Sequence, residues 1–437
     1  MQSSQGMVGS ACSFLRIATI ALSLLATIFV TIGWAQIPQE IPLADRTGVG
    51  ARAMGMAGAY SAAADDATAL YYNPAALARV ERIELSAVLT HHQTTKTTNY
   101  LGTKSEKTMS PSRISQMGFV YPFPTYRGSF VVGLSYHRIT DLDQDYLRRG
   151  EGGRVLFEDE NIFEEGSLGA WSAGLAWDAS PRVSIGAAAT LLAGTSYRER
   201  RYDYEASNGA FDNSLFIDDS EFSGVTGSVG ALIHVADNGR FALTIDLPKA
   251  LDFTGTASED VQYSYPSADS TIDVDYIDDF DFEDNMTLPF SVTTGLAWLF
   301  GPLLVAGDLQ FTDWTQLRYS GPMRTPWPDQ EYAYREVIAL RLGAEYSPEI
   351  WPVRFRAGIS RDPIPYKLIF TDVFNGGYET AAFSPERWEF AFGFGALLEE
   401  SFTIDAAYTH RWYEREGTGI IEGTNEDKIY LGAAFRF

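Results

Sequence analysis

The spacing of apolar and polar residues changes once along the chain, near residue 82. From there on, apolar residues recur at every second position, which is the period of a β-strand with two different faces. The pattern is clearest at 129–139, 388–395 and 402–409. In the second stretch one face carries Trp388, Phe390, Phe392 and Phe394, and the other carries Glu389, Ala391, Gly393 and Gly395. The region therefore predicts a succession of strands.

The two faces of these strands indicate the environment of the sheet. The largest residues lie on the same face in strand after strand, while the other face is small, polar or charged. A soluble β-sandwich also alternates, but it has no reason to place small and charged residues on its second face so regularly. A lipid-facing exterior and a polar lumen explain the pattern, and a closed barrel is the β-structure that can span a membrane. We predict an all-β protein, a transmembrane antiparallel β-barrel.

The connections between these strands come in two lengths that alternate strictly. Short turns are expected at 122–129, 178–182, 236–240, 300–302, 347–352 and 399–401, and long loops at 92–112, 140–167, 200–222, 255–286, 317–335, 362–386 and 413–426. Seven long loops and six short turns correspond to about fourteen strands. Outer-membrane barrels have short periplasmic turns and long extracellular loops, so the asymmetry supports this class.

The first residues have the features of an export signal. Arg16 is the only charge in the first 35 residues, 17–32 is an almost unbroken apolar run, and Gly33-Trp34-Ala35 resembles a cleavage site. We expect 1–35 to be a signal peptide; the alternative is a membrane anchor. The last strand, 429–437, ends in alternating apolar residues and a terminal Phe437, which resembles the insertion signal of outer-membrane barrels. Both ends predict the bacterial outer membrane.

Composition excludes several classes of function. The single cysteine, Cys12, lies in the expected signal, so we expect no disulfide, cysteine metal site or thiol nucleophile in the mature chain. The net charge is −24, and −25 without Arg16, which disfavours nucleic acid as a partner. A loose dinucleotide pattern at 48–53 follows no strand, and no G-x-S-x-G elbow occurs. We expect neither a cofactor nor a metal site, and no enzyme activity.

Residues 36–80 do not fit the wall. They are rich in Ala and Gly, lack the two-residue period, and are too short for a separate domain. Asp65-Asp66 could cap a short helix toward Tyr71, and Asn73-Pro74 is a turn initiator. Because a fourteen-stranded barrel encloses a space, we predict that 36–80 form a plug, or hatch, inside the lumen of a barrel formed by 81–437.

The stretch RAMGMAGAYSAAADDATALYYNPAAL resembles the hatch of the FadL/TodX family of outer-membrane transporters, whose Asn-Pro-Ala motif is matched by Asn73, Pro74 and Ala75. Further stretches at 288–298, 308–314 and 340–365 also resemble the family. The resemblance implies a fourteen-stranded barrel with an N-terminal hatch. It also implies uptake of long-chain fatty acids or aromatic hydrocarbons, with release through a lateral opening in the wall.

Lumen-facing arginines are the candidates for binding a ligand carboxylate, because a guanidinium can hold it with two hydrogen bonds. The alternation places four on that face, and the hatch supplies a fifth: Arg341, Arg354, Arg356, Arg436 and Arg52. The alternative, which we prefer for any one of them, is an ion-pair network with acidic residues such as Asp308, Glu345 and Asp405. The acidic run 273–285 suggests a solvated loop, with divalent-cation binding as the alternative.

The sequence thus predicts a passive outer-membrane transporter for hydrophobic molecules, most of all long-chain fatty acids, moving through an apolar tunnel gated by the hatch. Its expected partners are the hydrophobic ligand and the lipid and lipopolysaccharide of the outer membrane. The alternative is a structural or secretion-linked, PorV-like barrel. A hydrolase built on a barrel is a third possibility; it needs a Ser or Asp nucleophile beside a histidine at the rim of the lumen, a pairing that a sequence does not show.

Overall fold

The computed structural model describes residues 48–437, except 153–154, 267–270, 321–333, 366–368, 373–376, 381–385 and 418–419. The chain divides into two compact units. The larger, Ile41–Tyr366 with Ser384–Phe437, holds the features described below. In the smaller unit the described residues form a hairpin, β17 (Ile369–Asp372) and β18 (Gly377–Thr380). The expected signal peptide and residues 36–47 of the expected hatch lie outside the described residues.

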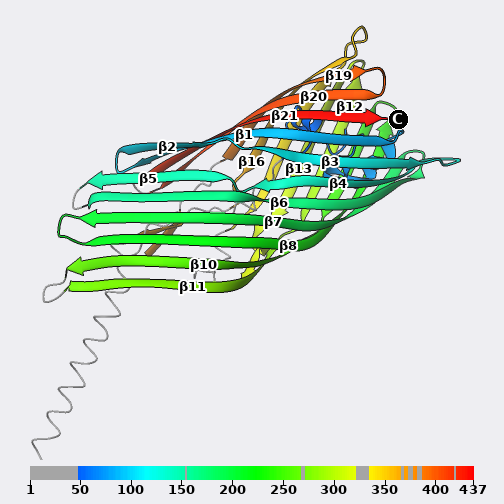
Figure 1. Cartoon of the computed structure of the whole chain (residues 1–437). Helices are drawn as coiled ribbons and strands as arrows, with labels where there is room; N and C mark the ends of the chain where they lie inside the picture. Colours follow the sequence, from blue (N-terminus) through cyan, green and yellow to red (C-terminus); the bar gives the residue numbers. More distant parts are fainter. Residues whose placement is uncertain are drawn as a thin grey trace, which may run out of the picture. The chain divides into compact units, whose positions relative to one another are not determined.

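The larger unit is a closed antiparallel barrel with fourteen strand positions (Figure 1). Single strands fill eleven positions: β1 (Glu84–Tyr100), β3 (Ser112–Phe123), β4 (Phe130–Asp141), β6 (Val155–Ser180), β7 (Val183–Ala206), β8 (Phe211–Ala236), β15 (Glu336–Tyr346), β16 (Val353–Pro363), β19 (Glu386–Leu398), β20 (Phe402–Gly417) and β21 (Ile420–Arg436). Interrupted strands fill three: β9 (Gly239–Asp246) with β10 (Lys249–Pro266), β11 (Thr271–Leu288) with β12 (Ser291–Phe300), and β13 (Leu303–Asp313) with β14 (Arg318–Ser320). The barrel closes because β1 pairs with both β3 and β21.

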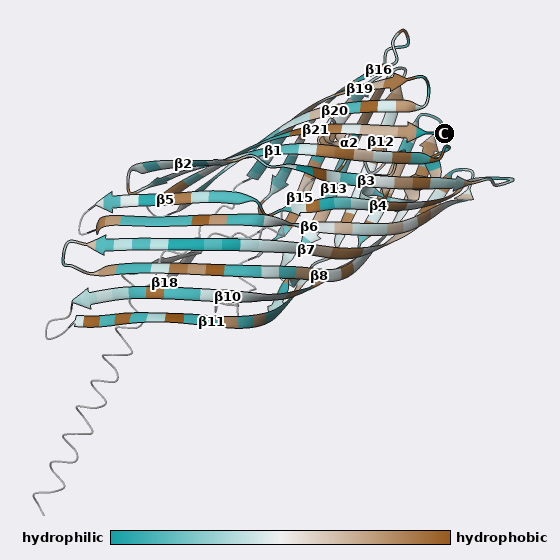
Figure 2. Cartoon of the chain, in the orientation of Figure 1, coloured by the Kyte–Doolittle hydropathy of each residue, from teal (hydrophilic) through white to brown (hydrophobic). Residues whose placement is uncertain are grey.

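The outer surface of the barrel carries the apolar face predicted from the alternation. Leu296, Leu342 and Phe392 are about half exposed or more, while their sequence neighbours face the lumen. Figure 2 shows hydrophobic residues gathered toward the end of the barrel where the short turns lie. The six predicted short turns all fall between consecutive strands. In the described residues no helix is long and apolar enough to cross a membrane.

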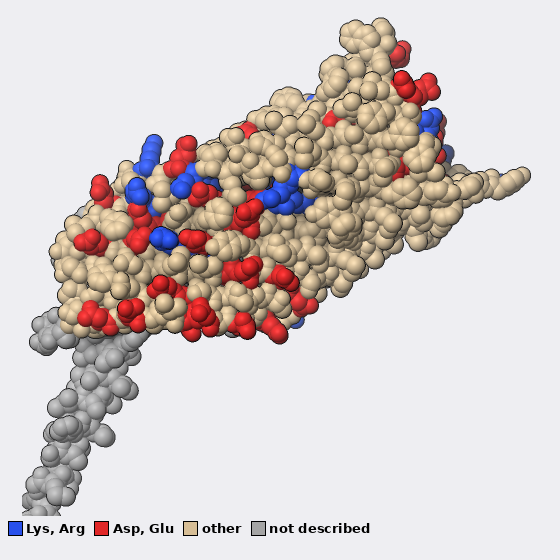
Figure 3. Space-filling model, viewed as in Figure 1, with Lys and Arg blue, Asp and Glu red and all other residues tan. Residues whose placement is uncertain are grey.

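Five of the predicted long loops, 92–112, 140–167, 200–222, 255–286 and 413–426, are strands over most of their length. β1 runs on to Tyr100 and is followed by β2 (Thr103–Met109), while β5 (Gln144–Gly152) and the first half of β6 fill 140–167. β10 and β11 are continuous through most of 255–286, including the acidic run. The alternation of apolar and polar residues disappears there because polar residues occupy both faces, including the buried face, which carries residues such as Thr98, Glu160 and Asp218. The hydrogen-bonded ladder nevertheless continues. Figures 2 and 3 show these strand ends as hydrophilic, with many Asp and Glu.

Two neighbouring strand positions are interrupted at the same level. The pairing of β9 with β12 and of β10 with β11 follows one register, which places Pro248 opposite Pro289. Proline has no N–H to donate to the ladder, so both strands break there. Before the break, in β9, even-numbered residues such as Thr244 face the lumen, whereas after it, in β10, odd-numbered residues such as Leu251 do. The neighbouring pair β11 and β12 changes in the same way. The wall therefore bends at this level.

The core of the barrel is the segment 48–80, here called the plug. It contains α2 (Ala51–Met54), α3 (Ala69–Tyr72) and the 3-10 helix η2 (Pro74–Arg79). Its small residues are almost fully buried and pack with lumen-facing residues of several strands, among them Val131, Leu232 and Ala306. Because the plug contacts strands all around the barrel, it fills the lumen at this level.

Candidate functional site

Glycines on the lumen face of the barrel wall allow the backbone of the plug to lie directly against the strands. A Cβ added at Gly358 of β16 would lie 2.4 Å from the carbonyl carbon of Met56, and one at Gly343 of β15 would lie 2.6 Å from its carbonyl oxygen. On β7, a Cβ at Gly186 would lie 2.5 Å from the carbonyl carbon of Pro74. These distances are too short for any side chain. The glycines on the lumen face are therefore required by the plug.

The Asn73-Pro74-Ala75 motif shapes the plug and attaches it to the wall. The Asn73 side-chain oxygen accepts a hydrogen bond from the Ala75 N–H at 3.1 Å and so caps η2, whose first residue is Pro74. The Asn73 amide donates to the carbonyl of Ser61 at 3.3 Å and to that of Ala231 in β8 at 3.2 Å. The predicted turn is confirmed, and the same side chain also ties the plug to the barrel.

Arg52 joins the plug to β15 through a charged network. Its guanidinium donates two hydrogen bonds to Glu345, at 2.8 and 2.9 Å, and a further one to Asp65 within the plug. Glu345 also accepts from Arg356 of β16 at 2.7 Å, and Arg356 in turn binds Asp405 of β20 at 2.7 Å. Because these groups are largely buried, each charge depends on the others for stability.

Asp65 lies at the meeting point of several cations. Arg52 binds it directly, and Arg79 and Arg436 lie 3.7 and 4.0 Å from its oxygens. Burial disfavours the ionised carboxylate, but the positive charges, led by Arg52, hold the pKa of Asp65 well below its usual range. Asp65 is therefore a fixed negative charge in the plug.

Further hydrogen bonds attach the plug to β1, β13 and β9. Asp308 of β13 accepts from the N–H groups of Tyr60 and Ser61 and from the Ser61 hydroxyl, at 2.7–2.9 Å. Glu84 of β1 accepts from the Ala67 N–H at 3.0 Å, and Thr244 of β9 donates to the Tyr72 carbonyl at 3.2 Å. The plug is held by directional contacts on several sides.

The predicted carboxylate-binding arginines have different surroundings. Arg356 is engaged with Glu345 and Asp405, and Arg436 donates to Glu84. The charge of Arg354 contributes to lowering the Asp65 pKa. Arg341 donates to Gln310 at 3.1 Å, and no salt bridge joins it to another described residue. Binding of a ligand carboxylate stays a prediction for all of them, and Arg341 is the best placed.

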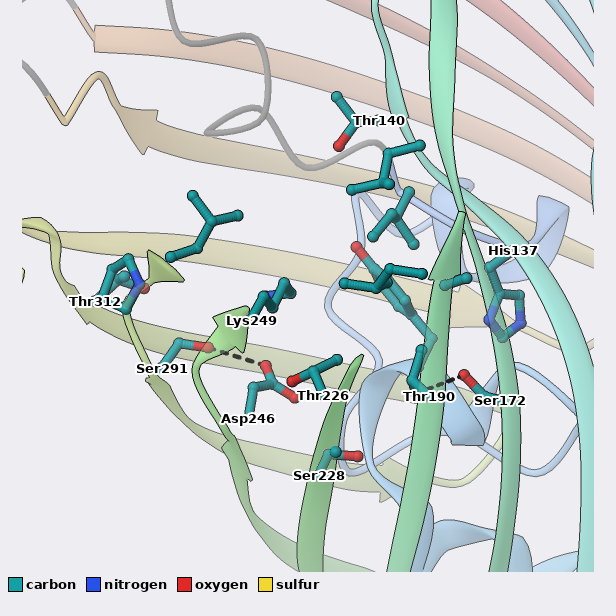
Figure 4. Close-up of a pocket in the computed structure, with 18 of the residues that line it drawn as sticks. His137, Thr140, Ser172, Thr190, Thr226, Ser228, Asp246, Lys249, Ser291 and Thr312 are labelled. Carbon is teal, nitrogen blue, oxygen red and sulfur yellow. Dashed lines mark hydrogen bonds between the residues drawn. The ribbon is translucent and has the colours of Figure 1, made fainter. Parts of the chain in front are cut away.

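Next to α3 the lumen contains a cavity with an empty volume of about 880 Å³, a figure that includes space open to solvent (Figure 4). Its wall is largely apolar, with Leu70 and Tyr71 of the plug facing side chains from many strands. The apolar wall residues include Ile139, Leu168, Leu192, Leu288 and Trp314. Hydrogen-bonded pairs such as Asp246 with Ser291, at 2.9 Å, form its polar edge.

A second cavity, of about 620 Å³, lies against the plug and is mainly polar. Arg341, Asp308 and Arg411 contribute to its wall. Tyr71, Asp246 and Gln310 line both cavities, so an apolar and a polar space adjoin across them. The sequence analysis missed this arrangement because its residues come from ten or more separated elements. In the described residues no group of three or more His, Cys, Asp or Glu could hold a metal ion.

An outwardly apolar barrel whose lumen is filled by its own N-terminal segment is a plugged outer-membrane barrel, not an open pore. A family model described as outer membrane protein transport protein (OMPP1/FadL/TodX) matches residues 40–427. The chain belongs to this family, and with it to the bacterial outer membrane. The family consists of transport proteins for hydrophobic compounds.

Several solved structures share this fold. A Pseudomonas aeruginosa FadL homologue is 15% identical with a TM-score of 0.64, covering 90% of this chain and 99% of that chain. The P. putida toluene transporter TodX is 14% identical with a TM-score of 0.65 and the same coverage. The Ralstonia pickettii toluene transporter TbuX is 16% identical with a TM-score of 0.57, covering 89% and 98%. A search of curated proteins found no match.

Proposed function

We propose that the protein is a passive transporter for amphipathic hydrophobic molecules, most of all long-chain fatty acids, and has no enzymatic activity. The observation that carries this proposal is the adjoining pair of cavities, one apolar and one polar with Arg341 in its wall. An acyl chain gains about 0.8 kcal/mol for each CH₂ transferred from water to apolar surroundings. A carboxylate can form charge-assisted hydrogen bonds with a guanidinium. The two cavities together suit both ends of such a molecule.

The residues around the plug support a role as the gate. The hatch of residues 36–80 would have to shift for a ligand to pass, since the plug and wall are in contact at the glycines. The signal peptide 1–35, the hatch 36–80 and the barrel 81–437 remain our proposed divisions of the chain. Deleting 36–80 should leave a folded barrel that conducts ions in a planar bilayer. A deletion variant that fails to insert would mean that the segment is a folding element, not a gate.

The wall offers a place for lateral release. β3 and β4 pair from Gln116 with His137 toward the short turn, but beyond this point they part. There, residues 112–114 of β3 pair with β1, while 138–141 of β4 pair with β6 across a bulge. We propose that ligand leaves the lumen between these two strand ends, within the lipid.

Toluene is the cargo named for several relatives, so aromatic hydrocarbons are the competing ligand class. The first test is extraction of bound ligand from the folded barrel after exposure to palmitate, hexadecane and toluene, quantified by mass spectrometry. Palmitate retention that falls in Arg341→Gln but not in Arg149→Gln would support the proposal, since Arg149 is an exposed residue that pairs with Asp159 and lines neither cavity. Retention of toluene alone would replace the fatty-acid assignment. The comparisons give no support to the secretion-linked alternative.

A further inference from the structure

Four buried polar atoms beside the plug have no hydrogen-bond partner within the described part of the chain. They are Ser86 Oγ on β1, Gln116 Oε1 on β3, and Ser135 Oγ and His137 Nε2 on β4. Gln116, Ser135 and His137 are each no more than 5% exposed. A buried polar group without a partner is destabilising, because it has lost its hydrogen bonds to water without replacing them. Four such groups in one place therefore require an explanation.

The sheet register brings these four residues together. Gly118 of β3 pairs with Ser86 on one side and with Ser135 on the other, which places both serines in one row. In the adjacent row, Gln116 pairs with His137. Adjacent strands are about 4.8 Å apart, and neighbouring residues on one face of a strand are about 6.7 Å apart. The four groups thus form one polar patch on the lumen face.

The plug meets this patch with small residues. A Cβ added at Gly118 would lie 2.3 Å from the Ala67 Cβ and 3.0 Å from the Ser86 hydroxyl. One added at Gly50 would lie 3.3 Å from Gln116 Oε1. The directional contacts of the plug described above reach β1 at Glu84 and β8, β9, β13, β15 and β21 instead. On this side a small shift of the plug would expose four ready hydrogen-bonding groups.

The patch is continuous with the apolar cavity. His137 lines that cavity, and its ring lies 5.8 Å from the ring of Tyr71 in an edge-to-face arrangement. His137 also belongs to the last residue pair before β3 and β4 separate. A molecule that moves from the cavity toward the parted strands would therefore pass this patch.

We propose that Ser86, Gln116, Ser135 and His137 form a subsite for the uncharged hydrogen-bonding head of an amphipathic ligand, such as a hydroxyl or a protonated carboxyl group. The inference rests on the proposed transport function. Serine hydroxyls and the histidine nitrogen can donate or accept, and the Gln116 oxygen can accept a hydrogen bond from such a head group. None of the four carries a fixed positive charge, which favours a neutral head over a carboxylate. The cations near these residues on the strands are paired: Arg138, which follows His137, with Asp141 and Asp143, and Arg436 with Glu84.

A pair of probes that share one chain isolates the head group: hexadecan-1-ol and hexadecane. In the Ser86→Ala/Ser135→Ala variant, the amount of hexadecan-1-ol bound relative to hexadecane should fall roughly five- to tenfold. This fall corresponds to the loss of one or two hydrogen bonds. The thermal unfolding midpoint should stay the same or rise, because unpartnered polar groups are replaced by apolar ones.

Ser115→Ala is the matched control. Ser115 is a buried neighbour of Gln116 on β3, but its hydroxyl accepts from Thr90 at 2.7 Å. This variant should lower the unfolding midpoint and leave the probe ratio unchanged. An unchanged ratio in the double variant would overturn the subsite, and so would a fall in its midpoint like that of the control. An unaltered barrel that retains neither probe would overturn the transport proposal itself.

Discussion

At the scale of single residues, the protein uses charge where a soluble core would use apolar packing. Arg52, Glu345 and Arg356 form a buried chain from the plug to β16. Buried ion pairs contribute little net stability against an apolar replacement, but removal of one partner leaves an unpaired charge. Such a network therefore holds the plug in one position relative to the wall.

Arg52→Ala should therefore loosen the plug. The change removes the only direct partner of Asp65 among Arg52, Arg79 and Arg436, and one of the two guanidinium partners of Glu345, which keeps Arg356, at a cost of up to about 3 kcal/mol. We expect more frequent open-channel events in planar bilayers and a lower unfolding temperature. Arg149→Ala, which breaks an exposed pair with Asp159, should change neither. If bilayer recordings of the Arg52→Ala variant show no channel openings, apolar packing alone retains the plug.

The depressed pKa of Asp65 predicts the pH range over which the plug is held. A carboxyl with a lowered folded-state pKa stabilises the fold at any pH above its unfolded value of about 3.9, and this contribution is lost as pH falls further. Ion conductance should thus be unchanged from pH 7 to about 4 and rise below it. Asp65→Asn should conduct more at neutral pH and respond less to acid. Opening of the unaltered protein between pH 7 and 5 would contradict this assignment.

At the scale of elements, the plug and the strands are fitted by glycine. Gly343 and Gly358 face Met56 from adjacent strands, and Gly186 faces Pro74 from the opposite side. In each case the wall residue is glycine, and the absence of a side chain lets the backbone of the strand and the backbone of the plug approach each other. The lumen-facing glycines seen in the sequence are thus part of the contact surface of the plug.

Gly358→Ala should displace the plug, because its Cβ would lie 2.4 Å from backbone that cannot move alone. Overpacking of this kind costs about 1–3 kcal/mol. We expect raised conductance with an intact barrel, judged by its electrophoretic mobility before and after heating. The control is Gly423→Ala, whose Cβ would meet only the Thr97 hydroxyl at 2.7 Å, the end of a side chain that can rotate away. Equal conductance in the two variants would argue against a tight fit.

At the scale of the whole molecule, the electrostatic field opposes an anionic ligand. The chain has a net charge of −24, and Asp and Glu gather on the long strand ends outside the apolar belt (Figure 3). A fatty-acid anion approaching this end meets repulsion that salt can screen. The polar patch for a neutral head group is consistent with passage in the protonated form.

The rate of palmitate association should accordingly rise with ionic strength, while that of toluene should not. Stopped-flow quenching of tryptophan fluorescence measures both rates at low and at 0.5 M salt, since Trp314 lines the apolar cavity. A palmitate rate that falls with salt would indicate a cationic entry site and contradict the repulsion argument.

The sequence by itself determined the barrel. Period-two alternation, alternating connection lengths and the outward aromatic residues depend only on local chemistry, since each residue faces either lipid or lumen. It also identified the turn at Asn73-Pro74 and the lumen-facing arginines. The long strand ends were missed because their buried face is polar as well as their exposed face, so the apolar alternation is lost. The breaks at Pro248 and Pro289 were visible only as prolines within strand patterns.

Only the tertiary structure decided which groups meet. Arg52 and Glu345 are 293 residues apart in the chain, and Gln116 and His137 come together through the register of two strands. Whether an arginine binds a partner, and whether a buried hydroxyl lacks one, depends on neighbours supplied by other elements. The cavities, the plug contacts and the polar patch are therefore properties of the closed barrel, because closure brings distant strands around one lumen.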